Sequence, residues 1–184
     1  MGFSHYYTIK KEIEQEVWNE FLKSVKKLYK NMPEHSHSSG DYFSDMPLAL
    51  NGCWKYEKPQ FTEEQIYFNG SNGLKRLQRH NGFDSKGKKK DVEWLDAKHS
   101  NNEWNDLGHE TFVLSRKGCE EFCKTARKPY DIMVQAVLII AKYYFESNIS
   151  IGSDGDMEDW REAIKFVCEV DATFLSTVLT DLFK

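Results

Sequence analysis

Long apolar segments are absent from this sequence. The longest, residues 132–141, is interrupted by Gln135 and is about half as long as a bilayer-spanning helix needs to be. The stretch therefore predicts a buried helix, and we expect no membrane partner.

Cysteine is sparse, with 4 residues in 184, and no secretory signal precedes them. Cys119 and Cys123 are spaced closely enough to share a site, but no second pair with metal-ligand spacing accompanies them. We therefore expect reduced thiols, a cytoplasmic location and no metal centre. The sequence leaves any cofactor unknown.

No charge of one sign dominates, since the formal net charge is -4. A cluster of lysines between Lys86 and Lys90 lies in a polar stretch, which is typical of a solvated surface. This balance argues against nucleic acid as a partner. Any contact with phosphate groups must come from a local cluster of cations.

What the sequence does contain is enough apolar material for one core. With 184 residues and 40% hydrophobic side chains, residues 1–184 are expected to form a single domain. Residues 71–107 are polar and irregular, so they predict a variable insertion or flexible loop within that domain. A connection of this length acts as a lid, binds a partner or is disordered.

The first half of the chain predicts a strand, a helix and two short strands. Aromatic and β-branched residues favour a strand over residues 3–9, and apolar residues at steps of three and four predict a helix over 12–31. Short strands are expected at 48–56 and 65–68, the second closing on an Asn69-Gly70 turn.

The second half predicts a strand at 109–114, a central buried helix from Pro129 to about residue 146, a strand at 149–151 and an amphipathic helix carrying Trp160. This order of elements is too irregular for a doubly wound fold. It indicates an α+β fold, with a mostly antiparallel or mixed sheet and helices packed on one face.

Five short segments stand out: SHYY at 4–7, IYFNG at 66–70, HETF at 109–112, FCKTARKPYD at 122–131 and SDG at 153–155. Together they resemble a family of uncharacterised proteins from bacteriophages and bacterial genomes. That family has no established activity, so the resemblance carries over no catalytic residue. It implies a phage or prophage protein in the cytoplasm of a bacterial host.

The segment at 122–131 places Lys124, Arg127 and Lys128 at the start of the predicted buried helix, where unpaired backbone amides and the helix dipole favour an anion. Arg127 offers a planar fork for a phosphate or carboxylate, and Thr125 offers a hydroxyl donor. The candidate ligand-binding residues are Lys124, Thr125, Arg127, Lys128, Asp131 and Asp154. The alternative is a salt-bridge network with the carboxylates at 154–159.

Three residues are candidates for acid–base catalysis: His5, His109 and Glu110. The two histidines lie on predicted strands, and two strand histidines facing one cleft would form an acid–base pair. Cys123 beside the cations is either a nucleophile with a lowered pKa or, by the stronger interpretation, a small core residue.

Three hypotheses for function follow. The first is a module that binds a small anionic, nucleotide-like ligand, with a role in phage–host conflict. The second is a hydrolase or transferase acting on a phosphorylated substrate. The third is an interaction factor that contacts a host or phage protein through residues 71–107.

Overall fold

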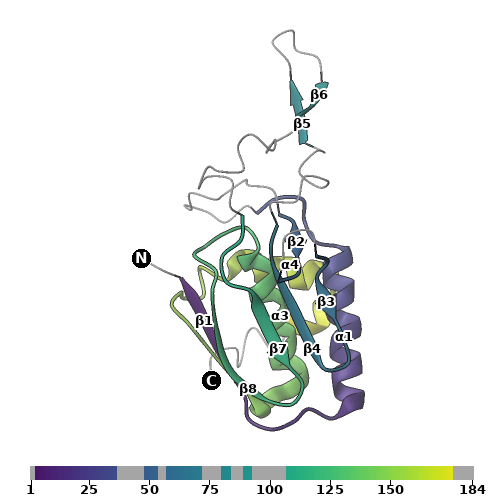
Figure 1. Cartoon of the computed structure of the whole chain (residues 1–184), viewed down its shortest axis with the longest axis vertical. Coiled ribbons are helices and arrows are strands. Elements are labelled where there is room, and N and C mark those ends of the chain that lie inside the picture. Colours follow the sequence, from purple (N-terminus) through teal and green to yellow (C-terminus); the bar gives the residue numbers. More distant parts are fainter. Residues whose placement is uncertain are drawn as a thin grey trace.

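The computed structural model describes residues 3–36, 48–53, 57–71, 80–83, 89–92 and 107–175. These residues form antiparallel sheets with helices packed on one side (Figure 1). The α+β class that the sequence predicts is therefore confirmed.

One sheet has three strands, and the N-terminal strand lies at its centre. Strand β1 (Ser4–Ile9) pairs antiparallel with β8 (Cys119–Lys124) on one edge and with β9 (Ile149–Ser153) on the other. Because side chains alternate across a strand, His5, Tyr7 and Ile9 are buried while Tyr6 is exposed on the opposite face.

The second sheet is built around β4 (Gln65–Gly70), which pairs antiparallel with three strands. These are β2 (Leu50–Asn51), β3 (Gln60–Phe61) and β7 (Phe112–Ser115). Two further strands, β5 (His80–Phe83) and β6 (Lys89–Val92), pair with each other in a separate two-stranded sheet.

The helices differ in how far they are buried. Helix α1 (Gln15–Lys30) and helix α4 (Arg161–Val170) are amphipathic, whereas α3 (Asp131–Phe145) is buried over almost its whole length, as the sequence predicts. Short 3-10 turns, η3 (Glu146–Asn148) and η4 (Ala172–Phe174), follow α3 and α4. Within the described residues, no helix combines the length and apolarity needed to cross a membrane.

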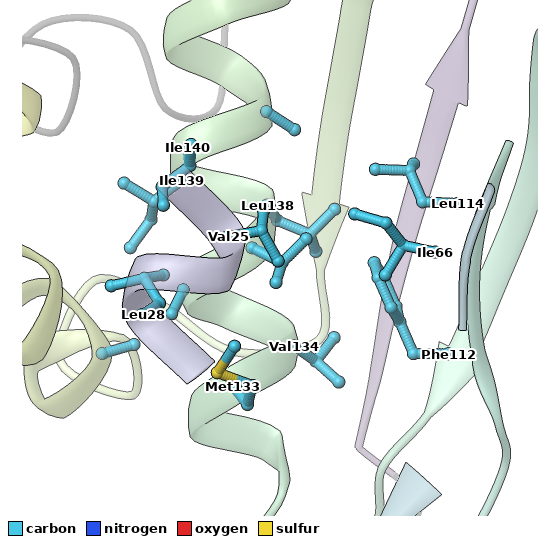
Figure 2. Packing of buried hydrophobic residues seen from close by; sticks show 14 of the residues in the cluster. Val25, Leu28, Ile66, Phe112, Leu114, Met133, Val134, Leu138, Ile139 and Ile140 are labelled. Atoms are coloured by element: carbon cyan, nitrogen blue, oxygen red, sulfur yellow. The ribbon is translucent and has the colours of Figure 1, made fainter. Parts of the chain in front are cut away.

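The core lies between the helices and the strands. Figure 2 shows Ile66 of β4 and Phe112 and Leu114 of β7 pointing towards Val25 of α1 and Leu138 of α3. All of these residues are buried, so the second sheet and the two longest helices enclose one apolar interior.

The turn predicted at Asn69-Gly70 is wrong, because β4 continues through both residues and Gly70 pairs with Leu50. Glycine is needed at position 70 for a reason other than a turn. A Cβ atom added at Gly70 would lie 1.8 Å from the carbonyl oxygen of Leu107, so the two backbones approach too closely for any side chain.

The polar stretch 71–107 is not wholly irregular, since β5 and β6 lie within it. Most of the remainder lies outside the described residues, as do residues 54–56 of the strand predicted at 48–56. Strand β3 was not predicted, because its two residues are too few to show a period.

The start of α3 also differs from the prediction that this helix begins at Pro129. Helix α3 begins at Asp131 after Tyr130, which makes no side-chain cap, and Pro129 lies before it. Asp156 accepts hydrogen bonds from the amides of Glu158 and Asp159, in the turn before α4. Asp154 does not cap this turn, because its carboxylate is bonded to β1.

Candidate functional site

The junction between β8 and α3 is held against the start of β1. The amides of Thr125 and Ala126 both donate to the carbonyl oxygen of Phe3, at 2.9 and 3.1 Å. Ala126 and Arg127 then take positive φ angles of 52° and 57°, which reverse the chain before α3 begins. The junction therefore has a fixed path from the sheet into the helix.

The structure separates the cations and the hydroxyl predicted at this junction. Arg127 and Lys128 line a cavity beside α3, and Lys124 lies outside that lining. Thr125 is fully buried, and its hydroxyl donates to the carbonyl oxygen of Phe3 at 3.4 Å. Its hydroxyl is therefore directed to the protein interior.

Arg127 has both an aromatic and an acidic neighbour. Its guanidinium lies over the Phe3 ring, 4.0 Å from the ring centre, and it forms an ion pair with Asp159. The hydrogen bond from Arg127 is the main reason why the pKa of Asp159 is lowered. For this cation, the predicted salt-bridge alternative is what the structure contains.

A hydrogen-bonded chain runs through the buried ring of His5. Its Nε2 atom lies 2.7 Å from Oδ1 of Asp131, and its Nδ1 atom lies 3.0 Å from the hydroxyl of Ser153. That hydroxyl oxygen also accepts from the Gly155 amide and the Trp160 indole, at 3.0 and 3.3 Å.

These contacts fix the tautomer of His5. A serine oxygen has two acceptor lone pairs, and Gly155 and Trp160 use both. The Ser153 hydroxyl must therefore donate its proton to Nδ1 of His5, and Nε2 of His5 carries the proton donated to Asp131. The assignment follows from the network of donors and acceptors.

Asp131 is held from a second side by the neighbouring turn of α3. Its Oδ2 atom accepts from the side-chain amide of Gln135 at 3.1 Å, and that amide also donates to the Asp159 carbonyl at 3.3 Å. Gln135 is 2% exposed, His5 is 0% exposed, and the Asp131 side chain is 14% exposed. Buried donors thus fix a carboxylate at the protein surface.

The cavity has a volume of about 650 Å³ and lies between the end of α1, the start of α3 and α4. The described residues that line it include five cations and five carboxylates. The cations are Lys27, Arg127, Lys128, Arg161 and Lys165, and the carboxylates are Asp131, Glu158, Asp159, Glu162 and Glu169. Ile132, Phe166 and Val170 add apolar surface.

His109 and Glu110 are not among the residues that line this cavity. His109 is exposed, and its backbone amide and carbonyl both bond to the side chain of Asn69. Glu110 accepts from the Lys124 amide at 2.7 Å and, through its carbonyl, from the Tyr130 hydroxyl at 2.6 Å. Both residues therefore hold neighbouring strand ends together. The ring of His5, which was predicted to face His109, pairs with Asp131.

Asp154 also stands apart from the cavity lining. It accepts from the Ser4 amide at 2.9 Å and the Tyr6 hydroxyl at 3.2 Å, and so ties β9 to β1. The buried thiol of Cys123 has a pKa raised to about 12 by burial, the opposite of the change that a nucleophile at this position requires. Cys123 is a core residue.

Sequence reasoning did not single out Ser153 as the partner of His5, Gln135 as a partner of Asp131, or the residues of α1 and α4 that line the cavity. One signal was present, because Gln135 is the polar residue that interrupts the longest apolar run. A polar side chain buried in such a run needs hydrogen-bond partners, and here these are Asp131 and Asp159.

Three of the five short segments noted in the sequence meet at this site. Residues 4–7 supply His5, residues 122–131 supply Arg127 and Asp131, and residues 153–155 supply Ser153. Comparison of the chain with protein-family models, with curated proteins and with solved structures found no match.

Proposed function

We propose that this protein binds a small, nucleotide-like ligand with an anionic group in the cavity between α1, α3 and α4. The observation that carries the proposal is that Arg127 and Lys128 line a cavity in which Asp131 is held by buried donors. A volume of about 650 Å³ is within the range of small-molecule sites, about 300–1,000 Å³.

The ion pairs at the cavity rim do not prevent an anion from binding. The side chains of Arg127 and Asp159 are 46% and 24% exposed, and exposed ion pairs contribute at most about 1 kcal/mol. A phosphate offers Arg127 a bidentate partner, which is a stronger acceptor than one oxygen of an exposed carboxylate. A phosphate can therefore compete with Asp159 for Arg127.

The cavity also has a side suited to a flat, apolar group. Ile132 of α3 and Phe166 and Val170 of α4 line it together with the charged residues. Small-molecule sites combine such apolar walls with a few polar groups that fix orientation. A nucleobase suits the apolar wall while a phosphate is held by the cations.

The test is binding of the ribonucleoside 5′-monophosphates and 3′,5′-cyclic monophosphates, measured by calorimetry and by thermal shift. The double variant Arg127→Ala, Lys128→Ala should weaken binding of the best ligand at least about tenfold, because charge-assisted hydrogen bonds are lost. Lys117→Ala is the matched control, since Lys117 is exposed and pairs with Glu64 away from the cavity. Equal affinity in the double variant and the wild type would exclude this site.

The second candidate is a hydrolase or transferase acting on a phosphorylated substrate. It is favoured by the buried contact of 2.7 Å between His5 and Asp131, because a carboxylate oriented in this way is suited to accept a proton. The same nucleotides would be incubated with the wild type and with His5→Gln, and the products identified by mass spectrometry. Intact nucleotides after prolonged incubation with the wild type would rule out turnover of these compounds.

A further inference from the structure

The charge of the cavity restricts which nucleotides suit it. Five cations and five carboxylates line it among the described residues, so their formal charges cancel. A triphosphate would bring several negative charges close to those carboxylates, and like charges at short range repel. The balance favours a ligand with one anionic group together with groups that donate hydrogen bonds.

Asp131 has acceptor capacity left for such a donor. A carboxylate has about four lone-pair sites. His5 and Gln135 occupy one on each oxygen, at 2.7 and 3.1 Å, and the side chain still reaches the cavity surface. Because both donors are buried, the carboxylate is fixed before any ligand arrives, which lowers the entropy lost on binding.

The spacing along the chain brings donor and acceptor within reach of one small molecule. Arg127 and Lys128 lie in the turn just before Asp131, the first residue of α3, and all three residues line the same cavity. A molecule with a phosphate and nearby hydroxyl groups can contact both the cations and the carboxylate. Acidic side chains accept from ribose hydroxyls in this manner in dinucleotide-binding folds.

We infer that Asp131 is the specificity-determining residue of the cavity, and that it accepts hydrogen bonds from the vicinal hydroxyls of a sugar monophosphate. This inference rests on the proposed function. His5 acts as a positioning residue, because it orients Asp131 and does not itself line the cavity. Ribonucleoside monophosphates and simple sugar phosphates share the required chemistry.

The experiment compares four probes on the full chain by calorimetry. They are the best-binding ribonucleoside 5′-monophosphate, its 2′,3′-dideoxy counterpart, the corresponding triphosphate and ribose 5-phosphate. The wild type should bind the dideoxy compound at least about tenfold more weakly than the ribonucleotide, since hydrogen bonds to a charged acceptor are lost. The triphosphate should bind more weakly than the monophosphate. Binding of ribose 5-phosphate at similar affinity would support recognition of the sugar phosphate alone, and weaker binding would support recognition of the whole nucleotide.

Asp131→Asn provides the matching protein change, with Glu120→Gln, an exposed carboxylate on β8, as control. The ratio of the two dissociation constants, dideoxy over ribo, should fall to near one in Asp131→Asn and stay unchanged in Glu120→Gln. If the role of Asp131 were purely structural, Asp131→Asn would lower the stability of the protein and leave this ratio unchanged.

Two results separate failure of this inference from failure of the proposed function. If the wild type binds ribo and dideoxy monophosphates within twofold, Asp131 does not recognise the sugar hydroxyls although the cavity binds nucleotides. If it binds the triphosphate more tightly than the monophosphate, the preference for one anionic group is wrong. If no monophosphate binds at all, both proposals fail. The probe comparison uses only the wild type, so it decides the question even if Asp131→Asn does not fold.

Discussion

At the scale of single residues, Gly70 shows how a close backbone approach restricts the sequence. A Cβ atom at this position would lie 1.8 Å from the Leu107 carbonyl oxygen, and a Cβ at Gly108 would lie 2.7 Å from the Gly70 carbonyl oxygen. Backbone atoms cannot rotate away as a flexible side chain can. The two glycines therefore let the segment before β7 cross the end of β4.

Substitution of Gly70 should be costly. Gly70→Ala is expected to lower the free energy of unfolding by about 1–3 kcal/mol, because the added methyl group forces the backbones apart. Gly152→Ala is the control, since a Cβ atom there meets the Tyr6 side chain at an ordinary 3.8 Å. Both variants would be unfolded in urea. Equal midpoints for the two would contradict this account of Gly70.

A second prediction at this scale concerns Cys123. Burial raises the pKa of its thiol to about 12, so very little of the reactive thiolate is present at pH 8. Iodoacetamide should therefore leave Cys123 unmodified in the folded protein while it modifies the exposed Cys53. Peptide mass spectrometry after labelling, with a sample in denaturant as control, measures both sites. Labelling of Cys123 at the rate of Cys53 would show that the site opens readily.

At the scale of elements, an ion pair joins the last turn of α1 to the residue after α4. Lys27 donates to Asp171 at 3.0 Å, and Asp171 also accepts from the Thr173 hydroxyl and amide at 2.7 and 3.1 Å. The Thr173 hydroxyl is the largest cause, and Lys27 the next, of a pKa for Asp171 lowered to about 2. The contact therefore depends on the ionised form of Asp171.

This lowered pKa gives the helix contact a pH dependence of known sign. A carboxylate whose pKa is lower in the folded state adds stability above its unfolded value, near 3.9, and loses that stability as pH falls through about 2. Asp171→Asn should destabilise the protein at pH 6 more than at pH 2. Urea unfolding at both pH values measures the difference.

The control for this prediction is Glu20→Gln. Glu20 pairs with Lys23 on the exposed face of α1, where such pairs contribute little. If Asp171→Asn lowered the free energy of unfolding equally at pH 2 and pH 6, the negative charge of Asp171 would not be what stabilises the helix contact.

At the scale of the whole molecule, the sequence predicts individual helices and strands better than the contacts between them. The apolar period of residues 12–31 identified α1, and the apolar run before residue 146 identified α3 as central. The two-residue strand β3 has no period to detect, whereas β2 lies within the strand predicted at 48–56. The pairing of β1 with β8 and β9 leaves no local signal either, because its partners are far along the chain.

The candidate site shows the same contrast between local signals, which the sequence contains, and tertiary contacts, which it does not reveal. Cation placement at 124–128 indicated Arg127 and Lys128, which line the cavity, but it could not show that the Thr125 hydroxyl points inward. Histidine patterns suggested a pair of His5 with His109, whereas strand register brings His5 to Ser153 and α3 brings Asp131 to its ring. Register and helix packing are set by the whole fold, so a single sequence does not reveal them.

The central position of β1 has a consequence for the order in which the candidate site assembles. His5 must wait for Asp131, 126 residues later, and for Ser153, 148 residues later, before its hydrogen bonds can form. Contacts between residues so far apart in the sequence slow folding, and on the ribosome β1 would stay unpaired until β8 and β9 have been synthesised. The hydrogen bonds that hold Asp131 through His5 would thus be complete only after β9 has left the exit tunnel.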